Sequence, residues 1–226
     1  MAGKPDPEAA RAKYARLAPT YDRQLWWLRD FQEPLRRSAV ELLQLQAGQV
    51  VVDVGCGTGA SFRLLEEAVG PSGHIIGIEQ SGQMLQFARE RIDVARWRNV
   101  TLLEMSADDP RDLGRLADAA LFFFTHDILR TPAAVEATLS RLKSGGRVAA
   151  AGMKRTSSWC GTPLNLAALA VARRYVTTLE GLERPWSHLE SHLSRLQVEP
   201  SGFGLLYVAF GKKDLADDRR ASERRS

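Results

Sequence analysis

The segment that most constrains the fold is 50–60, with the sequence VVVDVGCGTGA. Its apolar residues run almost without interruption, which is typical of a strand buried on both faces of a parallel sheet. Glycine then stands at every second position, at Gly55, Gly57 and Gly59, and allows a sharp turn in which bare backbone approaches a ligand. The helix expected over 61–69 would direct its free N–H groups at that ligand. The segment therefore predicts a strand, a ligand-binding loop and a helix.

The loop fits the dinucleotide pattern G-x-G-x-x-G/A, which by itself does not choose a ligand. With Asp53 two residues before the first glycine, the strict alternation resembles the first motif of the class I S-adenosylmethionine (SAM)-dependent methyltransferases, D/E-x-G-x-G-x-G. A carboxylate suits SAM, which carries an ammonium and a sulfonium, and would repel the pyrophosphate of NAD. The resemblance implies SAM as the cofactor, bound by Asp53, Gly55, Cys56, Gly57 and Gly59.

An acidic residue ends the second predicted strand, which covers 73–79. Glu79 lies about 20 residues past the loop, where a carboxylate accepts two hydrogen bonds from a ribose diol in both SAM and NAD enzymes. Ser81 is the expected N-cap of a helix over 82–96. The resemblance implies that Gln80 and Met84 contact the adenine, and a simple core position for Met84 is an equal alternative.

The third predicted strand, 100–105, leads into a departure from the family pattern. The family often continues as G-D-A-x-x-L-P, in which the Asp binds the adenine amino group. Here Ser106 stands at that position, followed by Ala107, and both are carried over as cofactor-binding residues. Either Ser106 or Asp108 would then accept the hydrogen bond from the adenine amino group. Alternatively, Asp108 and Asp109 cap a short helix expected over 110–116.

The fourth predicted strand, 118–125, ends at Thr125 and His126. Ligands of doubly wound sheets bind beyond the carboxyl ends of the strands, so both residues lie on the functional edge. Thr125 is expected to contact the cofactor. A neutral His126 could take a proton from the acceptor as its catalytic base. The alternative is that His126 shapes the cofactor pocket through its backbone.

The N-terminal segment carries a second resemblance. Residues 14–22, YARLAPTYD, are similar to the Y-x-x-x-A-x-x-Y-D segment of the quinone-biosynthesis-like methyltransferases. This implies a helical cap over 1–46 in which Tyr21 lies near the reacting methyl group and Tyr14 contacts the cofactor. The alternative is that both tyrosines pack the cap onto the core. A helix over 24–46 is expected to break at Pro34.

The rest of the chain completes a class I methyltransferase domain over 47–211. The segment 142–148, LKSGGRV, is similar to the family's approach to its fifth strand, with a helix from 132 to 143 ended by glycine and a strand over 147–153. Residues 154–187 are predicted to be an insertion that covers the substrate. His188 and His192 are placed on one helix face, but no metal site is expected without a third ligand. A hairpin over 197–211 and a disordered tail over 212–226 follow.

The implied fold is α/β, a doubly wound, seven-stranded and mostly parallel Rossmann-like sheet with an N-terminal helical lid. The 226 residues suffice for one such domain. The basic residues behind the net charge of +4 are scattered among acids, so no nucleic-acid partner is expected. Two cysteines without metal spacing favour a reducing, cytoplasmic location. No apolar run approaches the roughly 20 residues that span a bilayer.

The function implied by the resemblance is methyl transfer from SAM to an O, N or C nucleophile of a small molecule. The Asn/Asp-Pro-Pro-aromatic run of nucleobase amino-methyltransferases is absent after the fourth strand. A quinone-like or lipid acceptor stays open because of Trp26 and Trp27, and the sequence gives no oligomeric state. The alternatives are an NAD-linked oxidoreductase, for which no Tyr-x-x-x-Lys is found, and a SAM-binding regulatory protein without turnover.

Overall fold

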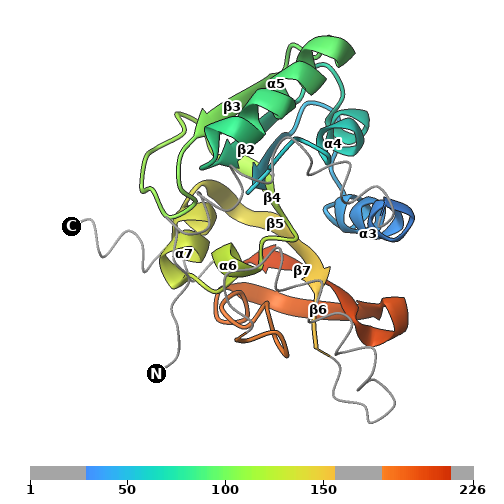
Figure 1. Ribbon diagram of the computed structural model, residues 1–226. Coiled ribbons are helices and arrows are strands. Elements are labelled where there is room, and N and C mark those ends of the chain that lie inside the picture. Colours follow the sequence, from blue (N-terminus) through green and yellow to red (C-terminus); the bar gives the residue numbers. More distant parts are fainter. Residues whose placement is uncertain (1–28, 156–179, 215–226) are drawn as a thin grey trace, which may run out of the picture.

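The protein is described by a computed structural model that covers residues 29–155 and 180–214 (Figure 1). Seven strands form one sheet: β1 Val50–Val54, β2 His74–Glu79, β3 Val100–Glu104, β4 Ala117–Phe123, β5 Leu142–Met153, β6 Leu193–Ser201 and β7 Leu206–Lys213. Their order across the sheet is β3-β2-β1-β4-β5-β7-β6. The predicted strands are therefore all present within the described residues.

The sheet is mostly parallel, as predicted. β1 pairs in parallel with β2 on one side and with β4 on the other, and β3 and β5 extend this arrangement outward. β7 runs antiparallel to both of its neighbours, β5 and β6. The strand order reverses between β1 and β4, and a ligand crevice forms beyond the carboxyl ends of the strands at such a point.

Helices cover both faces of the sheet (Figure 1). The first face carries α3 Arg29–Leu42, α4 Phe62–Val69 and α5 Gly82–Ala95, and the second carries α6 His126–Leu129 and α7 Pro132–Ser140. Because side chains alternate along a strand, Val51 packs with Leu65 in the first core while Val52 packs with Val135 in the second. This double coverage explains the unbroken apolar character of β1.

The break expected at Pro34 is wrong, because α3 continues through this residue. Proline removes one backbone hydrogen bond from a helix interior. The opposite side of the helix compensates by packing, since Leu35, Ala39 and Leu43 are buried against the sheet while Pro34 is exposed. Tertiary packing thus outweighs the local cost of the proline.

The short helix expected over 110–116 does not form. Instead, the buried side chain of Arg141 binds the backbone that leads into this segment: Nη1 donates to the carbonyl of Ala107 at 3.3 Å, and Nη2 donates to the carbonyls of Asp109 and, at 3.4 Å, Arg111. These carbonyls are satisfied by a guanidinium rather than by helical N–H groups. A long-range contact of this kind cannot be read from the local composition.

The junction between α7 and β5 also differs from the prediction. α7 ends at Ser140 and β5 begins at Leu142, so the two glycines expected to end the helix lie inside the strand. Ala117 donates to the carbonyl of Arg141 at 2.8 Å and thereby starts the ladder early. The register then shifts before Ala119, which leaves the glycine pair as an irregularity in the strand.

The C-terminal part of the described chain confirms the predicted hairpin, with β6 and β7 joined through a short 3-10 turn at Gly202–Gly204. β7 extends to Lys213, so the strand enters the predicted tail. The helix expected to carry His188 and His192 is replaced by consecutive turns. These turns are anchored by Trp186, whose ring lies 4.8 Å from that of Tyr207.

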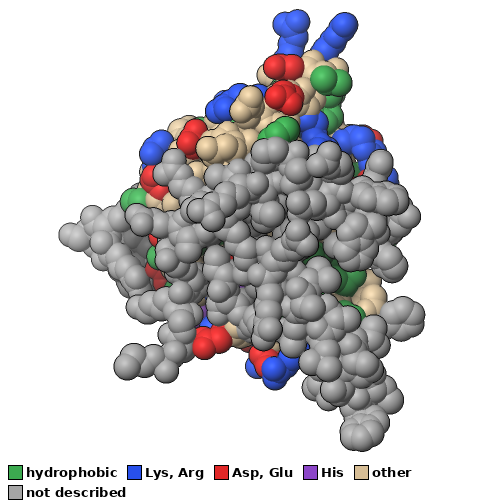
Figure 2. Space-filling model, viewed as in Figure 1, with side chains coloured by type: hydrophobic (Ala, Val, Ile, Leu, Met, Phe, Trp, Pro, Cys, Tyr) green, Lys and Arg blue, Asp and Glu red, His purple; other side chains and the backbone are tan. Residues whose placement is uncertain are grey.

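Parts of the predicted cap and substrate-covering insertion, residues 1–28 and 156–179, lie outside the described residues, as does the tail from 215. The described helices include none that is long and apolar enough to cross a membrane. On the face shown in Figure 2, the described surface side chains mix Lys and Arg with Asp and Glu, as the scattered charge pattern predicts.

Candidate functional site

The glycine loop leaves β1 in a left-handed conformation. Gly55, Gly57 and Gly59 have φ angles of 71°, 55° and 76°, values that glycine adopts at little cost. The backbone N–H groups of Gly55 and Cys56 both donate to the carbonyl of Ile78, at 2.8 and 3.0 Å. The loop is therefore held against the end of β2, next to the acidic residue that follows.

The three glycines meet different surroundings. A Cβ on Gly55 would lie 2.6 Å from the Thr125 methyl group, and one on Gly59 would lie 2.5 Å from the ring of Phe62. A Cβ on Gly57 would meet no atom within 4 Å. Packing inside the protein thus demands glycine at the first and third positions. The middle position faces open space, where a ligand can approach the backbone.

Glu79 lies at the end of β2 and holds this loop. Its Oε2 accepts from the backbone N–H of Gly57 at 3.2 Å, and its Oε1 accepts from that of Ser81 at 2.8 Å. Burial raises the pKa of the Glu79 carboxyl, and these backbone donors oppose the rise. A carboxylate has about four acceptor positions, so Glu79 keeps capacity to accept from a ligand hydroxyl.

The residues after Glu79 enter α5. Ser81 caps this helix as predicted, because its Oγ accepts from the backbone N–H of Met84 at 3.4 Å. Met84 is buried, while Gln80 is partly exposed beside the loop. The side chain of Cys56 belongs to the core cluster under α4, so this residue offers a ligand its backbone only.

Asp53 is a buried carboxylate near the carboxyl end of β1, a central strand of the sheet. It is 1% exposed, and its Oδ2 has no hydrogen-bond partner among the described residues. Burial raises the pKa of Asp53 to about 7; the positive charge of Arg36 opposes this rise, and the negative charge of Glu79 adds to it. A buried acceptor of this kind is costly unless a ligand satisfies it.

Arg36 is a residue that the sequence reasoning missed. It lies on α3, is 8% exposed and stacks its guanidinium 4.3 Å above the ring of Phe123 at the end of β4. Its Nε has no hydrogen-bond partner among the described residues. The signal in the sequence was its spacing, because Arg36 shares the buried helix face of Ala39, Val40 and Leu43.

Thr125 and His126 complete the edge beyond β4. Thr125 Oγ1 is buried without a partner in the described structure. The ring Nε2 of His126 lies 3.0 Å from the carbonyl of Glu180, and because a carbonyl only accepts, Nε2 carries the proton. Nδ1 then has a free lone pair, and it too is buried without a described partner. Burial lowers the pKa of His126, which keeps the ring neutral at pH 7.

These buried polar atoms all lie near the carboxyl ends of the paired strands β1 and β4. Asp53 comes from β1, Thr125 and His126 follow β4, and Arg36 reaches the end of β4 from α3. Buried polar atoms are nearly always hydrogen-bonded in native proteins, so a concentration of exceptions requires an explanation. The explanation that fits the topology is a polar ligand seated beyond the carboxyl ends of β1 and β4.

Ser106 and Asp108 extend the site past β3. The hydroxyl of Ser106 donates to Oδ1 of Asp108, so the two candidate acceptors form one polar group. Met105 donates to the backbone carbonyl of Glu79 at 3.1 Å, which places this group beside the end of β2. Ala107 between them is buried. The predicted residues Tyr14 and Tyr21 lie outside the described residues.

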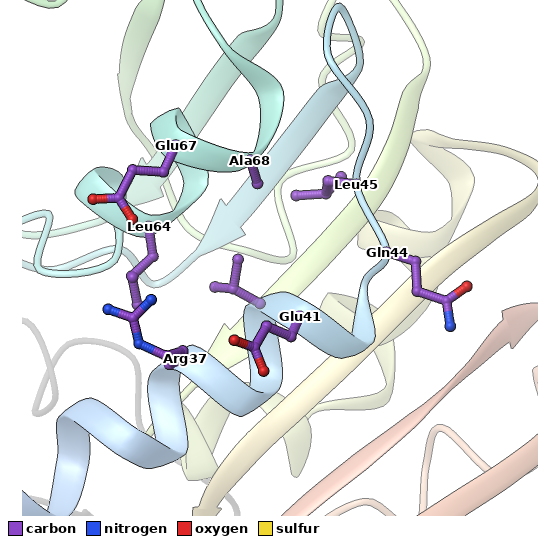
Figure 3. Close-up of a pocket in the computed structure, with 8 residues that line it drawn as sticks. Arg37, Glu41, Gln44, Leu45, Leu64, Glu67 and Ala68 are labelled. Atoms are coloured by element: carbon purple, nitrogen blue, oxygen red, sulfur yellow. The ribbon is translucent and has the colours of Figure 1, made fainter.

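Within the described ranges, no group of three His, Cys, Asp or Glu side chains could hold a metal ion. A pocket of about 270 Å³ lies between α3 and α4 (Figure 3), lined by Arg37, Val40, Glu41, Gln44, Leu45, Leu64, Glu67 and Ala68. Gly48, just before β1, bonds to Val69 at the end of α4, so this pocket lies toward the opposite ends of the strands.

Residues 51–146 match a family model described as a methyltransferase domain. The match runs from β1 to the start of β5 and includes the glycine loop, Glu79, Ser106 and His126. It therefore contains the described edge of the sheet, apart from Arg36.

Similar proteins carry related names. The chain is 31% identical over 101 residues to the demethylmenaquinone methyltransferase of Listeria welshimeri, a match that covers 44% of this chain and 43% of that protein. It is 33% identical over 124 residues to an aklanonic acid methyltransferase of Streptomyces sp., with coverage of 53% and 55%. These matches span about half the length of the curated relatives.

A solved structure shares the fold. The precorrin-6y C5,15-methyltransferase of Geobacter metallireducens superposes with a TM-score of 0.56 at 20% identity, covering 79% of this chain and 87% of that one. At this identity the likeness concerns the fold, which agrees with the sheet order described above.

Proposed function

Because the chain resembles the class I SAM-dependent methyltransferases of quinone biosynthesis and has S-adenosylmethionine as its cofactor, we propose that it transfers the SAM methyl group to an O, N or C nucleophile of a small molecule. The observation that carries this proposal is the buried carboxylate of Asp53, whose Oδ2 has no partner among the described residues, at the end of the strand that leads into the loop with the open backbone of Gly57. A carboxylate in that position offers a counter-charge to a cationic ligand.

The cofactor would be bound by parts that differ in chemistry. Glu79 offers its two oxygens to the ribose diol, while the Ser106–Asp108 pair offers an acceptor to the adenine amino group. Asp53 faces the amino-acid end, where SAM carries its ammonium. Gln80, Met84 and Thr125 are proposed to line the same crevice.

The reaction itself demands little covalent chemistry from the protein. A nucleophile on the acceptor attacks the methyl carbon, the carbon–sulfur bond breaks, and the sulfonium becomes a neutral thioether. The protein contributes alignment of acceptor, methyl and sulfur, together with exclusion of water. His126 is the proposed base, acting through Nδ1 because Nε2 is held by the carbonyl of Glu180. Tyr21 is proposed to lie near the methyl group.

The proposed acceptor is a quinone-like small molecule rather than a nucleic acid. Two relatives are named for demethylmenaquinone and aklanonic acid, both small molecules. The findings do not favour an NAD-linked oxidoreductase or a SAM-binding protein without turnover. The proposed acceptor class therefore rests on the named relatives, whereas the proposed cofactor-binding roles rest on the residues of the site.

Radiolabelled SAM tests this function. The full chain would be incubated with methyl-labelled SAM and, in separate reactions, demethylmenaquinol, aklanonic acid and a ribosomal RNA fragment. We expect label in one of the small molecules and none in the RNA, with the signal reduced in Asp53→Asn. Glu67→Gln, an exposed change on α4, is the matched control. Label in the RNA alone would contradict the proposed acceptor class.

A further inference from the structure

Arg141 is a buried arginine whose side-chain partners are all backbone carbonyls. It is 4% exposed, and its two terminal nitrogens donate to the carbonyls of Ala107, Asp109 and Arg111. The ion pairs found among the described residues do not include Arg141. Burying an arginine is costly because its charge loses hydration, and neutral carbonyls compensate for that loss less well than a carboxylate does. The contact therefore has a cost that calls for an explanation.

The backbone of Arg141 is fixed on both sides. Arg141 lies between the end of α7 and the start of β5. Its N–H donates to the carbonyl of Thr138 at 3.1 Å, and its own carbonyl accepts from the N–H of Ala117 at 2.8 Å. Thr138 and Ala117 are both buried. The guanidinium, a planar group with five donors, thus projects from a base that belongs to the core.

The segment that Arg141 binds has no helix or strand of its own. It runs from the carboxyl end of β3 to the start of β4, over residues 105–116. Without a helix or a ladder, its buried carbonyls need other donors. The carbonyls of Ala107 and Asp109 stand on either side of Asp108 in the chain. Arg141 therefore holds the backbone both before and after that residue.

Asp108 carries the carboxylate of the polar pair at this end of β3. The hydroxyl of Ser106 donates to its Oδ1. A carboxylate has about four acceptor positions, so the pair keeps capacity to accept from a ligand. The N–H of Met105 donates to the carbonyl of Glu79 at 3.1 Å and ties the start of the segment to β2. The pair is thus held by Met105 on one side and by Arg141 on the other.

We propose that Arg141 is a positioning residue for selection of the nucleobase, because it fixes the Ser106–Asp108 pair where that pair accepts from the adenine amino group. This inference rests on the proposed function, in which the pair binds adenine. An acceptor that is held in place loses little entropy when its ligand binds. A segment without this anchor could move its carboxylate away from a base that offers no donor, and selectivity would fall.

The test compares two nucleosides by calorimetry on the full chain. S-adenosylhomocysteine and S-inosylhomocysteine differ at one position of the base, where an amino group is replaced by a carbonyl oxygen that cannot donate. The wild type should bind the adenine compound about tenfold or more tightly, the size of one hydrogen bond to a charged group. Arg141→Met should reduce that ratio to less than about threefold.

Arg115→Met is the matched control for the loss of one arginine from this region. Arg115 is exposed in the same segment, and its charge acts on His74 at the start of β2, the end of that strand opposite to Glu79. Arg115→Met should leave the ratio of the two affinities as it is in the wild type. A ratio that falls equally in both variants would show that lost positive charge, rather than the position of Arg141, is responsible.

A double-mutant cycle tests whether Arg141 acts through Asp108. Asp108→Ala should lower the ratio by itself, and adding Arg141→Met should lower it no further, because two residues that act as one unit are not additive. Arg141→Lys keeps a charge but lacks the planar fork, so it too should lower the ratio. Should Arg141→Met not fold, Arg141→Lys carries the same comparison.

The outcomes separate this inference from the proposed function. If Arg141→Met weakens both nucleosides by the same factor, or weakens neither, Arg141 has a structural role only and the inference is wrong while cofactor binding stands. A wild-type chain that binds both nucleosides equally would also contradict the inference. If the wild type binds neither nucleoside, the proposed function itself fails.

Discussion

The backbone N–H of Gly57 donates to Oε2 of Glu79 at 3.2 Å, so the acid that ends β2 holds the loop that follows β1. The two features most typical of a nucleoside-binding sheet are therefore one hydrogen-bonded unit. Ser81 completes this unit by donating to the other oxygen of the same carboxylate. Glu79 consequently shapes the loop before any ligand is present.

Replacing Glu79 should weaken cofactor binding more than it lowers the stability of the fold. Glu79→Ala removes the ribose acceptor and the loop anchor together, and we expect SAM binding to lose about 1–3 kcal/mol, the usual cost of a charged hydrogen bond. Isothermal calorimetry measures this change, with Glu67→Ala on the exposed side of α4 as the control. Unchanged affinity in a folded Glu79→Ala would exclude this residue from the site.

The three loop glycines should respond differently to alanine. Gly57→Ala has open space for its methyl group and should cost about 1–2 kcal/mol of stability from the left-handed backbone alone. Gly55→Ala and Gly59→Ala add a clash with Thr125 or Phe62 and should lower the melting temperature further. Thermal unfolding monitored by circular dichroism measures the melting temperatures of the three variants.

Although Gly57→Ala should be the least destabilising of the three changes, it should weaken cofactor binding. A methyl group there projects into the open side of the loop, so Gly57→Ala should stay folded and lose SAM affinity. A Gly57→Ala variant that binds SAM as the wild type does would show that the ligand does not approach this position.

Asp53 should make the stability of the unliganded protein depend on pH. Its ordinary pKa is 3.8 and its folded pKa is about 7, so between these values the folded chain keeps a proton that the unfolded chain has lost. Stability must then fall as pH rises from about 4 to about 7, by roughly 1.4 kcal/mol for each unit of pKa difference. Urea unfolding across this range measures the slope.

Asp53→Asn is the control for this slope. The amide cannot ionise, so the decline attributable to position 53 should disappear. In the wild type, the SAM ammonium favours the ionised carboxylate, so SAM affinity should rise with pH over the same window. An identical pH slope in Asp53→Asn and wild type would contradict the raised pKa.

His126→Ala should lower turnover by about 10²–10⁴-fold if the ring acts as a general base, with SAM affinity changed far less. The pKa of His126 lies below its usual 6.5, so turnover should stay constant near neutral pH and decline only in more acidic solution. Stopped-time assays with the labelled cofactor measure both quantities. A variant with wild-type turnover would leave His126 a role in shaping the pocket.

The sequence predicted those features that depend on residues close together in the chain. Each followed from a local signal: glycine spacing for the loop, an unbroken apolar run for the buried parallel strand β1, an acid at a strand end for Glu79, and a capping residue before a helix for Ser81. The departure at Ser106 was also visible, and the structure links it to Asp108, the alternative acceptor.

Features set by distant contacts could not be predicted in this way. Where a helix was expected over 110–116, Arg141 binds the carbonyls of Ala107 and Arg111 from 34 and 30 residues away in the sequence. Arg36 reaches the end of β4 only because α3 packs over that strand. No local sequence pattern predicts this packing. Its charge within an apolar helix face was the available signal, and such a residue merits attention as a candidate ligand-binding group.

The most direct test of the account is calorimetric titration of the folded, full-length chain with SAM, because every role assigned here depends on that cofactor. We expect saturable heat corresponding to one binding site per chain, absent when NADH replaces SAM and weakened in Asp53→Asn. Folded protein that gives no heat with SAM or with S-adenosylhomocysteine would contradict the central claim.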